Sequence, residues 1–135
     1  MRNFILFREK DISNISGIGI VAEGTEFTDG SVALRWVVGD HRSTSTWNSM
    51  EDVKEIHGHS GATLIIYCGV AYSLEEVKNL LLKIVSVYST FKAQEIYKLA
   101  STIFPEFLLK SAIKELTLEN KLTYDWNGNY TRVNK

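Results

Sequence analysis

Two kinds of hydrophobic pattern divide this chain near residue 70. Before that point, apolar residues come in short runs or alternate with polar ones, and the runs are separated by glycine-containing breaks. After it, apolar residues recur at intervals of three and four, the spacing of helices with a buried face. The pattern therefore predicts an α+β protein with two domains, residues 1–70 and 71–135.

The first seventy residues predict five short strands. Alternation is clearest in Ser31–Val38, where Val32, Leu34 and Trp36 share one face. Gly24 interrupts another strand and predicts a bulge or a tight bend. The strands are expected at Asn3–Arg8, Ile20–Phe27, Ser31–Val38, His41–Trp47 and Ala62–Tyr67. Because such short strands expose their edges unless the sheet closes, the pattern favours a small β-barrel of the SH3-like or OB-like kind.

One short helix is predicted between the fourth and fifth strands. Ser49 stands three residues before Asp52, a spacing that lets the serine cap the first turn. Val53 and Ile56 supply an apolar side. Gly58 stands where a glycine often ends a helix.

The second domain opens with a longer helix that starts at Ser73, with Glu76 completing a capping box. Its apolar positions cover most of the circumference and are Val77, Leu80, Leu81, Leu82, Ile84, Val85 and Tyr88. A helix of this kind is buried on more than one side. We therefore expect it to pack on its own domain and on the β module or a second subunit, and we predict a homodimer.

Two further helices and a hairpin follow, in the order of a winged helix-turn-helix domain. The first helix is expected at Lys92–Ala100, and Pro105 starts the next, where its missing N–H costs nothing. The inward residues of that last helix are Leu109, Ala112, Ile113 and Leu116. Asn127-Gly128 is a strong turn signal. It would join two strands, Lys121–Trp126 and Asn129–Val133.

The composition excludes several classes of protein. The chain has 135 residues, of which 44% are hydrophobic, enough to form a core. No apolar run approaches the roughly 18 residues of a membrane span, and the first residues do not form a signal peptide. The single cysteine, Cys68, excludes an internal disulfide and favours a reducing, cytoplasmic setting. We expect Cys68 to be a small buried hydrophobic residue.

Several motifs of the first domain carry a resemblance. The string S-G-I-G-I-V-A-E-G at Ser16–Gly24 is followed by Asp29-Gly30, Trp36, Trp47 and I-H-G-H-S-G at Ile56–Gly61. In this order the motifs resemble a small β module of phage, prophage and archaeal proteins, over about residues 4–67. The resemblance implies a viral or mobile-element setting and assigns no catalytic residue.

Residues 74–133 resemble the winged-helix domains of archaeal and bacterial transcription regulators in the order and spacing of their elements. The resemblance implies that the last helix enters the major groove of DNA and that the hairpin contacts the backbone. The implied contacts are Lys110, Ser111, Lys114, Lys121 and Arg132. Glu106 and Phe107, at the start of the same helix, suit a protein partner at least as well.

The charge distribution gives DNA binding only mild support. Residues 1–72 contain six basic and nine acidic side chains, whereas residues 73–135 contain nine basic and seven acidic. The second domain is thus the basic one, but proteins dedicated to nucleic acids are usually more basic than this.

Two histidines are the strongest candidates for metal chemistry. His57 and His59, one residue apart, could face one metal together with Asp52 or Glu55. The competing interpretation is that both histidines end the helix and bond to the backbone, where a protonated imidazole also gains from the helix dipole. We favour the second interpretation, because the single cysteine and the scattered histidines provide no second ligand pair.

The sequence gives weaker support for catalysis and for the binding of single-stranded nucleic acid. No nucleophile elbow is present, and the carboxylates at Glu51-Asp52 and Glu75-Glu76 fit helix starts. Four aromatic residues with two neighbouring arginines could stack single-stranded bases, although they are better explained as core: Phe27, Trp36, Trp47 and Tyr67, with Arg35 and Arg42.

The hypotheses for function are therefore ranked. The first is a non-enzymatic protein without a cofactor that binds double-stranded DNA and regulates transcription through a winged helix. The second is a protein-interaction adaptor or inhibitor of host machinery. The third is a metal- or nucleotide-binding sensor.

Overall fold

The computed structural model describes residues 1–135 except 11–17, 40–41, 59–60, 90, 125–127 and 134–135. It divides into two compact units, Met1–Cys68 and Gly69–Lys135. Each unit combines helical structure with antiparallel strands, so the mixed α+β class is confirmed. No helix of the described segments is long and apolar enough to cross a membrane.

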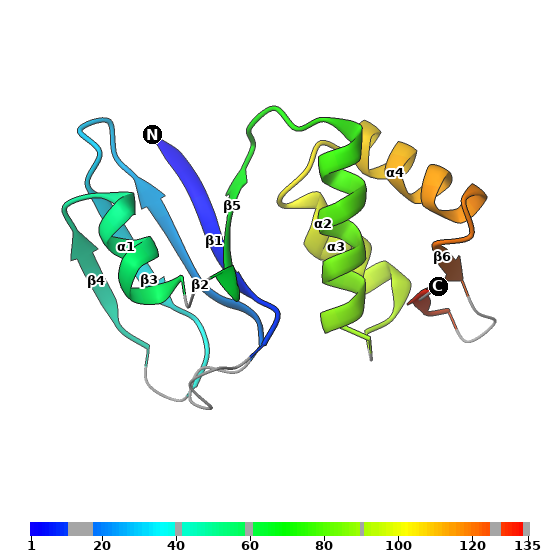
Figure 1. The fold of residues 1–135 in the computed structure, drawn as a ribbon, viewed down its shortest axis with the longest axis horizontal. Coiled ribbons are helices and arrows are strands. Elements are labelled where there is room, and N and C mark those ends of the chain that lie inside the picture. The colour runs from blue at the N-terminus through cyan, green and yellow to red at the C-terminus, as the bar shows by residue number, and fades with distance from the viewer. Residues whose placement is uncertain (11–17, 40–41, 59–60, 90, 125–127, 134–135) are drawn as a thin grey trace. The chain divides into compact units, whose positions relative to one another are not determined.

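The described part of the first unit is a five-stranded antiparallel sheet with one helix, α1 (Figure 1). The elements are β1 (Arg2–Arg8), β2 (Gly19–Glu26), β3 (Val32–Trp36), β4 (Thr44–Trp47), α1 (Met50–His57) and β5 (Thr63–Cys68). The strand order is β4-β3-β2-β1-β5, with β4 and β5 at the two edges. As predicted, Ser49 caps α1 by accepting a hydrogen bond from the Asp52 N–H.

The predicted barrel is wrong for the described strands, because the two edge strands do not pair and the sheet stays open. The hydrophobic face is covered instead by α1. Met50 and Val53 of the helix pack on a buried cluster that includes Phe4 and Leu34. A helix that covers this face removes the need for the sheet to bury it by closing on itself.

Gly24 does not form the predicted bulge. It pairs in regular register with Phe4 on one side and Leu34 on the other. The irregularity lies at the other end of the β1–β2 pair, between Leu6 and Phe7. A Cβ at Gly24 would lie 2.6 Å from Cζ of Phe4, so the glycine makes room for the phenylalanine ring.

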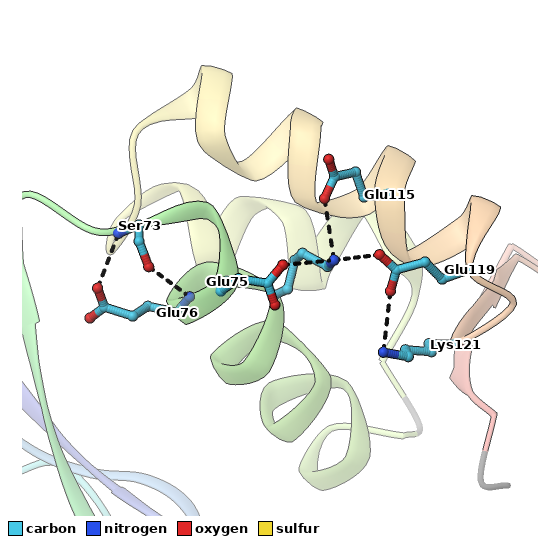
Figure 2. Close-up of polar contacts among 7 residues, drawn as sticks. Ser73, Glu75, Glu76, Glu115, Glu119 and Lys121 are labelled. Atoms are coloured by element: carbon cyan, nitrogen blue, oxygen red, sulfur yellow. Dashed lines mark hydrogen bonds and ion pairs between the residues drawn. The ribbon is translucent and has the colours of Figure 1, made fainter.

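Three helices and a two-stranded hairpin make up the second unit, as far as its residues are described. The elements are α2 (Leu74–Val87), α3 (Ala93–Ser101), α4 (Glu106–Leu118), β6 (Leu122–Tyr124) and β7 (Tyr130–Arg132). The capping box of Ser73 and Glu76 is present at the start of α2 (Figure 2). Of the predicted turn, Asn127 lies outside the described residues, and Gly128 has the positive φ of 86° that favours glycine.

The core of this unit follows the predicted helical stripes. Val77, Leu81 and Ile84 of α2 are buried, as are Leu109 and Leu116 of α4. The hairpin is joined to the start of α3, where the Ala93 N–H donates a 2.8 Å hydrogen bond to the Gly128 carbonyl oxygen. Backbone bonding therefore fixes the hairpin against the helices, and α2 and α4 contact its strands.

Candidate interaction surfaces

The outward face of α4 carries two large apolar side chains at its ends. Phe107 is 70% exposed and Leu118 is 72% exposed. Ser111 and Lys114 lie between them and are also exposed. Steps of four, three and four residues put these side chains in one stripe, opposite the buried residues of the helix. We call Phe107, Ser111, Lys114 and Leu118 the outward α4 face.

Lys110 borders this face and is held by a carboxylate. Its Nζ lies 3.2 Å from Oε1 of Glu106, which also accepts a 3.1 Å hydrogen bond from the Tyr97 hydroxyl. Lys110 and then Tyr97 lower the pKa of Glu106, and Glu106 raises the pKa of Lys110. Because the pair is well exposed, it adds little to stability, and Lys110 stays available to other partners.

Lys121 and Arg132, the two basic residues predicted for the hairpin, lie on a different side. Both line an open pocket together with Asn79 and Leu82 of α2. Arg132 donates to the Ser86 hydroxyl of α2 at 3.2 Å. The five residues predicted to contact DNA therefore fall into two groups, one on α4 and one between α2 and the hairpin.

A buried lysine that the sequence patterns did not single out joins α2 to α4. The Lys78 side chain is only 6% exposed, and its ammonium group lies 3.2 Å from carboxylate oxygens of Glu75 and Glu115. Glu119 provides a third, closer carboxylate (Figure 2). Only Glu75 could have been found from spacing, because it stands three residues before Lys78 whereas the other two come from α4.

The carboxylates fix the charge of this lysine. Glu119, followed by Glu115 and Glu75, raises the pKa of Lys78 although burial opposes the shift. The amine is therefore protonated at neutral pH and cannot act as a nucleophile, which requires a lowered pKa. The arrangement stabilises the α2–α4 contact and is unsuited to covalent catalysis.

In the first unit, His57 is part of an aromatic cluster. Its ring centroid lies 5.0 Å from that of Trp36 and 5.2 Å from that of Trp47, and both contacts are edge-to-face. Both tryptophans pack on the core. Among the described residues, no three His, Cys, Asp or Glu side chains could hold a metal ion. His59 lies outside the described residues, so the two-histidine site stays a prediction.

The other two aromatic residues proposed for base stacking have different surroundings. Tyr67 packs edge-on against Phe4 at 6.2 Å, and the Arg2 guanidinium lies over its ring at 4.0 Å. The Tyr67 hydroxyl also donates to Glu26, whose pKa is lowered mainly by Arg2. Phe27 is 41% exposed. Three of the four rings are thus engaged in packing within the unit.

Cys68, at the end of β5, is half-buried. Burial raises the pKa of its thiol, and the charge of Glu23 adds to this shift. A raised pKa disfavours the reactive thiolate, although Cys68 is less buried than predicted.

The two units define a small α+β protein. The family model for the Acb5 phage protein matches residues 1–69, and the chain belongs to this family. The match supports the phage-type module predicted from the motifs of the first domain. Comparisons with curated proteins and with solved structures find no match.

Proposed function

We propose that this phage protein is a non-enzymatic adaptor or inhibitor that binds a protein of the infected cell through the outward α4 face. The observation that carries the proposal is the exposure of Phe107 and Leu118 on one helix face. Aromatic side chains such as Phe107 are enriched at the buried cores of protein interfaces, and Leu118 adds apolar area on the same helix face. Lys114 between them would select a partner with an acidic group at the centre of the contact.

We further propose that the second unit is a winged helix used as a scaffold for this face. Three helices followed by a hairpin, with the hairpin bonded to the start of α3, support that assignment. In this fold α4 is the recognition helix. The same helix would therefore serve recognition, but of a protein surface rather than of base edges.

The test is capture from a lysate of the bacterial host by the wild-type chain and by the double variant Phe107→Ala/Leu118→Ala. We expect the double variant to retain roughly one-tenth or less of the captured partner, because it lacks both anchors. Ile56→Ala is the matched control, since Ile56 is 56% exposed in the other unit. Capture is quantified by mass spectrometry and repeated with the purified partner.

Equal capture by wild type and the double variant would overturn the proposal. Light scattering on both proteins identifies one special case, the predicted homodimer. If the protein bound by the outward α4 face is a second copy of this chain, the wild type is dimeric and the double variant is monomeric.

Duplex DNA is the second candidate for the same helix, favoured by the exposure of Lys110, Ser111 and Lys114 along it. In this alternative the two lysines contact phosphates and Ser111 reaches a base edge. The surface ion pair of Lys110 with Glu106 would have to exchange for a phosphate contact. The separation of Lys121 and Arg132 from this helix weighs against a joint contact with the hairpin.

The DNA alternative predicts that Lys110→Glu/Lys114→Glu abolishes binding to random duplex in a gel shift. The wild-type affinity should then fall with rising salt by about one log unit per log of salt for each phosphate contact. Phe107→Ala/Leu118→Ala should bind DNA as wild type does. Binding that survives the charge reversal excludes α4 as the DNA site. The metal- or nucleotide-binding sensor stays a prediction, and the metal content of the purified protein tests its metal-binding form.

A further inference from the structure

The open pocket between α2 and the hairpin is separate from the outward α4 face. Its volume is about 400 Å³, within the range of small-molecule sites. The lining residues are Asn79, Leu82, Glu119, Asn120, Lys121, Arg132 and Val133. All of them belong to the second unit, so the pocket is formed by one compact body.

The hydrogen-bonding groups left over in this pocket are mainly donors. Among the described residues of the lining, Glu119 is the one acidic side chain, and both of its oxygens are engaged, Oε1 by Lys78 and Oε2 by Lys121. Arg132 has five N–H donors, and the hydrogen bond to Ser86 uses one of them. The Lys121 ammonium has three donors, of which Glu119 takes one.

Two side-chain amides and an apolar wall complete the lining. Asn79 comes from α2 and Asn120 from the turn after α4, so donors approach from both sides of the pocket. Leu82 and Val133 provide the apolar surface. A group that accepts several hydrogen bonds and carries an attached hydrocarbon portion would match both features.

We propose that this pocket binds an organic oxyanion, a carboxylate or a phosphate ester. Arg132 faces the anion with its planar fork, Lys121 adds charge, and the two asparagine amides fix the orientation. Leu82 and Val133 contact the hydrocarbon part of the ligand. The site goes beyond the proposed protein-binding function, because it uses none of the residues of the outward α4 face.

This chemistry has two sources, a free small molecule and the C-terminal carboxylate of a peptide. The probes are inorganic phosphate, glycerol phosphate, and acetyl-trialanine in its free-acid and amidated forms. Each is titrated into the 135-residue chain at constant ionic strength and followed by amide chemical shifts. We expect saturable shifts at Asn79 and Asn120 with glycerol phosphate or with the free-acid peptide. The amidated peptide should leave both signals unchanged.

Variants at Arg132 test whether the probes bind in this pocket. We expect Arg132→Ala to weaken binding about tenfold or more, as loss of a charge-assisted donor does. Arg132→Lys should also weaken binding, because an ammonium keeps the charge but not the fork. Lys98→Ala, on the exposed side of α3, is the control and should change affinity less than twofold.

Three results would overturn the proposal. One is the absence of saturable binding by every probe. Another is binding that Arg132→Ala and Arg132→Lys both leave unchanged. The third is equal binding of the amidated and free-acid peptides together with no response to glycerol phosphate. Capture of a protein partner by the outward α4 face is measured separately, so the two proposals can fail independently.

Discussion

Replacing Lys78 with methionine is expected to lower the unfolding midpoint of the second unit by roughly 5–10 °C at pH 7. Methionine fills much the same space, so the change removes the ammonium group with little loss of packing. Glu75, Glu115 and Glu119 would then face one another without the cation that holds them. Removing one partner of a buried ionic group destabilises, because the charges that remain are uncompensated.

The pH dependence of this effect follows from the shifted groups. The pKa of Glu119 is lowered, chiefly by Lys78, from its ordinary value of 4.5. Its contribution to stability is therefore present above pH 4.5 and is lost as the pH falls through the lower, folded-state pKa. The pKa of Lys78 is raised from 10.5, so its contribution is fully present below that pH. The difference in stability between the wild type and the Lys78→Met variant should therefore be largest between these two pH limits.

Thermal unfolding followed by the helical circular dichroism signal at pH 7 and near pH 3 checks this expectation. The difference between wild type and Lys78→Met should shrink at the lower pH, where protonated carboxyl groups no longer repel one another. Lys98→Met is the control, an exposed lysine of α3 that should give no such difference. A variant as stable as wild type at pH 7 would show that the lysine contributes only its hydrocarbon chain.

The elements of this fold were predictable wherever a side-chain period decides burial. The stripe of Val77, Leu81 and Ile84 located α2, and the alternation of Val32 and Leu34 located β3. Closure of the sheet was not predictable in the same way. The alternating pattern of a strand specifies only that one face of the sheet must be buried. That face can be buried by closure of the sheet into a barrel or by a covering helix such as α1.

The interaction surfaces were predictable only in part, because polar contacts between distant segments have no period. The exposed positions of α4 follow directly from its buried stripe. In contrast, the pairing of Lys78 with Glu115 and Glu119 depends on how two helices pack. The same holds for Arg132, whose bond to Ser86 turns it toward α2. Composition alone could not show that Lys78 and Arg132 are engaged by other side chains of the unit whereas Lys110 and Lys114 are exposed on α4.

Gly24→Ala is expected to lower the free energy of unfolding of the first unit by about 1–3 kcal/mol, the usual cost of forcing an added methyl group into a filled core. The new Cβ would collide with the Ala33 carbonyl oxygen and lie 2.6 Å from Cζ of Phe4. Phe4 is 1% exposed, so its ring has little freedom to move aside. Glu23→Ala, at the neighbouring exposed position, is the control and should change stability by less than about 0.5 kcal/mol.

The clash with the Phe4 ring and the clash with the Ala33 backbone can be separated by replacing the ring with a smaller side chain. In the background of Phe4→Leu, the clash with Cζ disappears while the clash with the Ala33 backbone remains. The cost of Gly24→Ala should therefore fall in that background without reaching zero, giving a coupling of roughly 0.5–1.5 kcal/mol. Denaturant unfolding followed by tryptophan fluorescence in a Trp126→Phe background reports on this unit, since the two remaining tryptophans, Trp36 and Trp47, pack on its core. Equal costs in both backgrounds would mean that the strand backbone alone, and not the phenylalanine ring, requires glycine at this position.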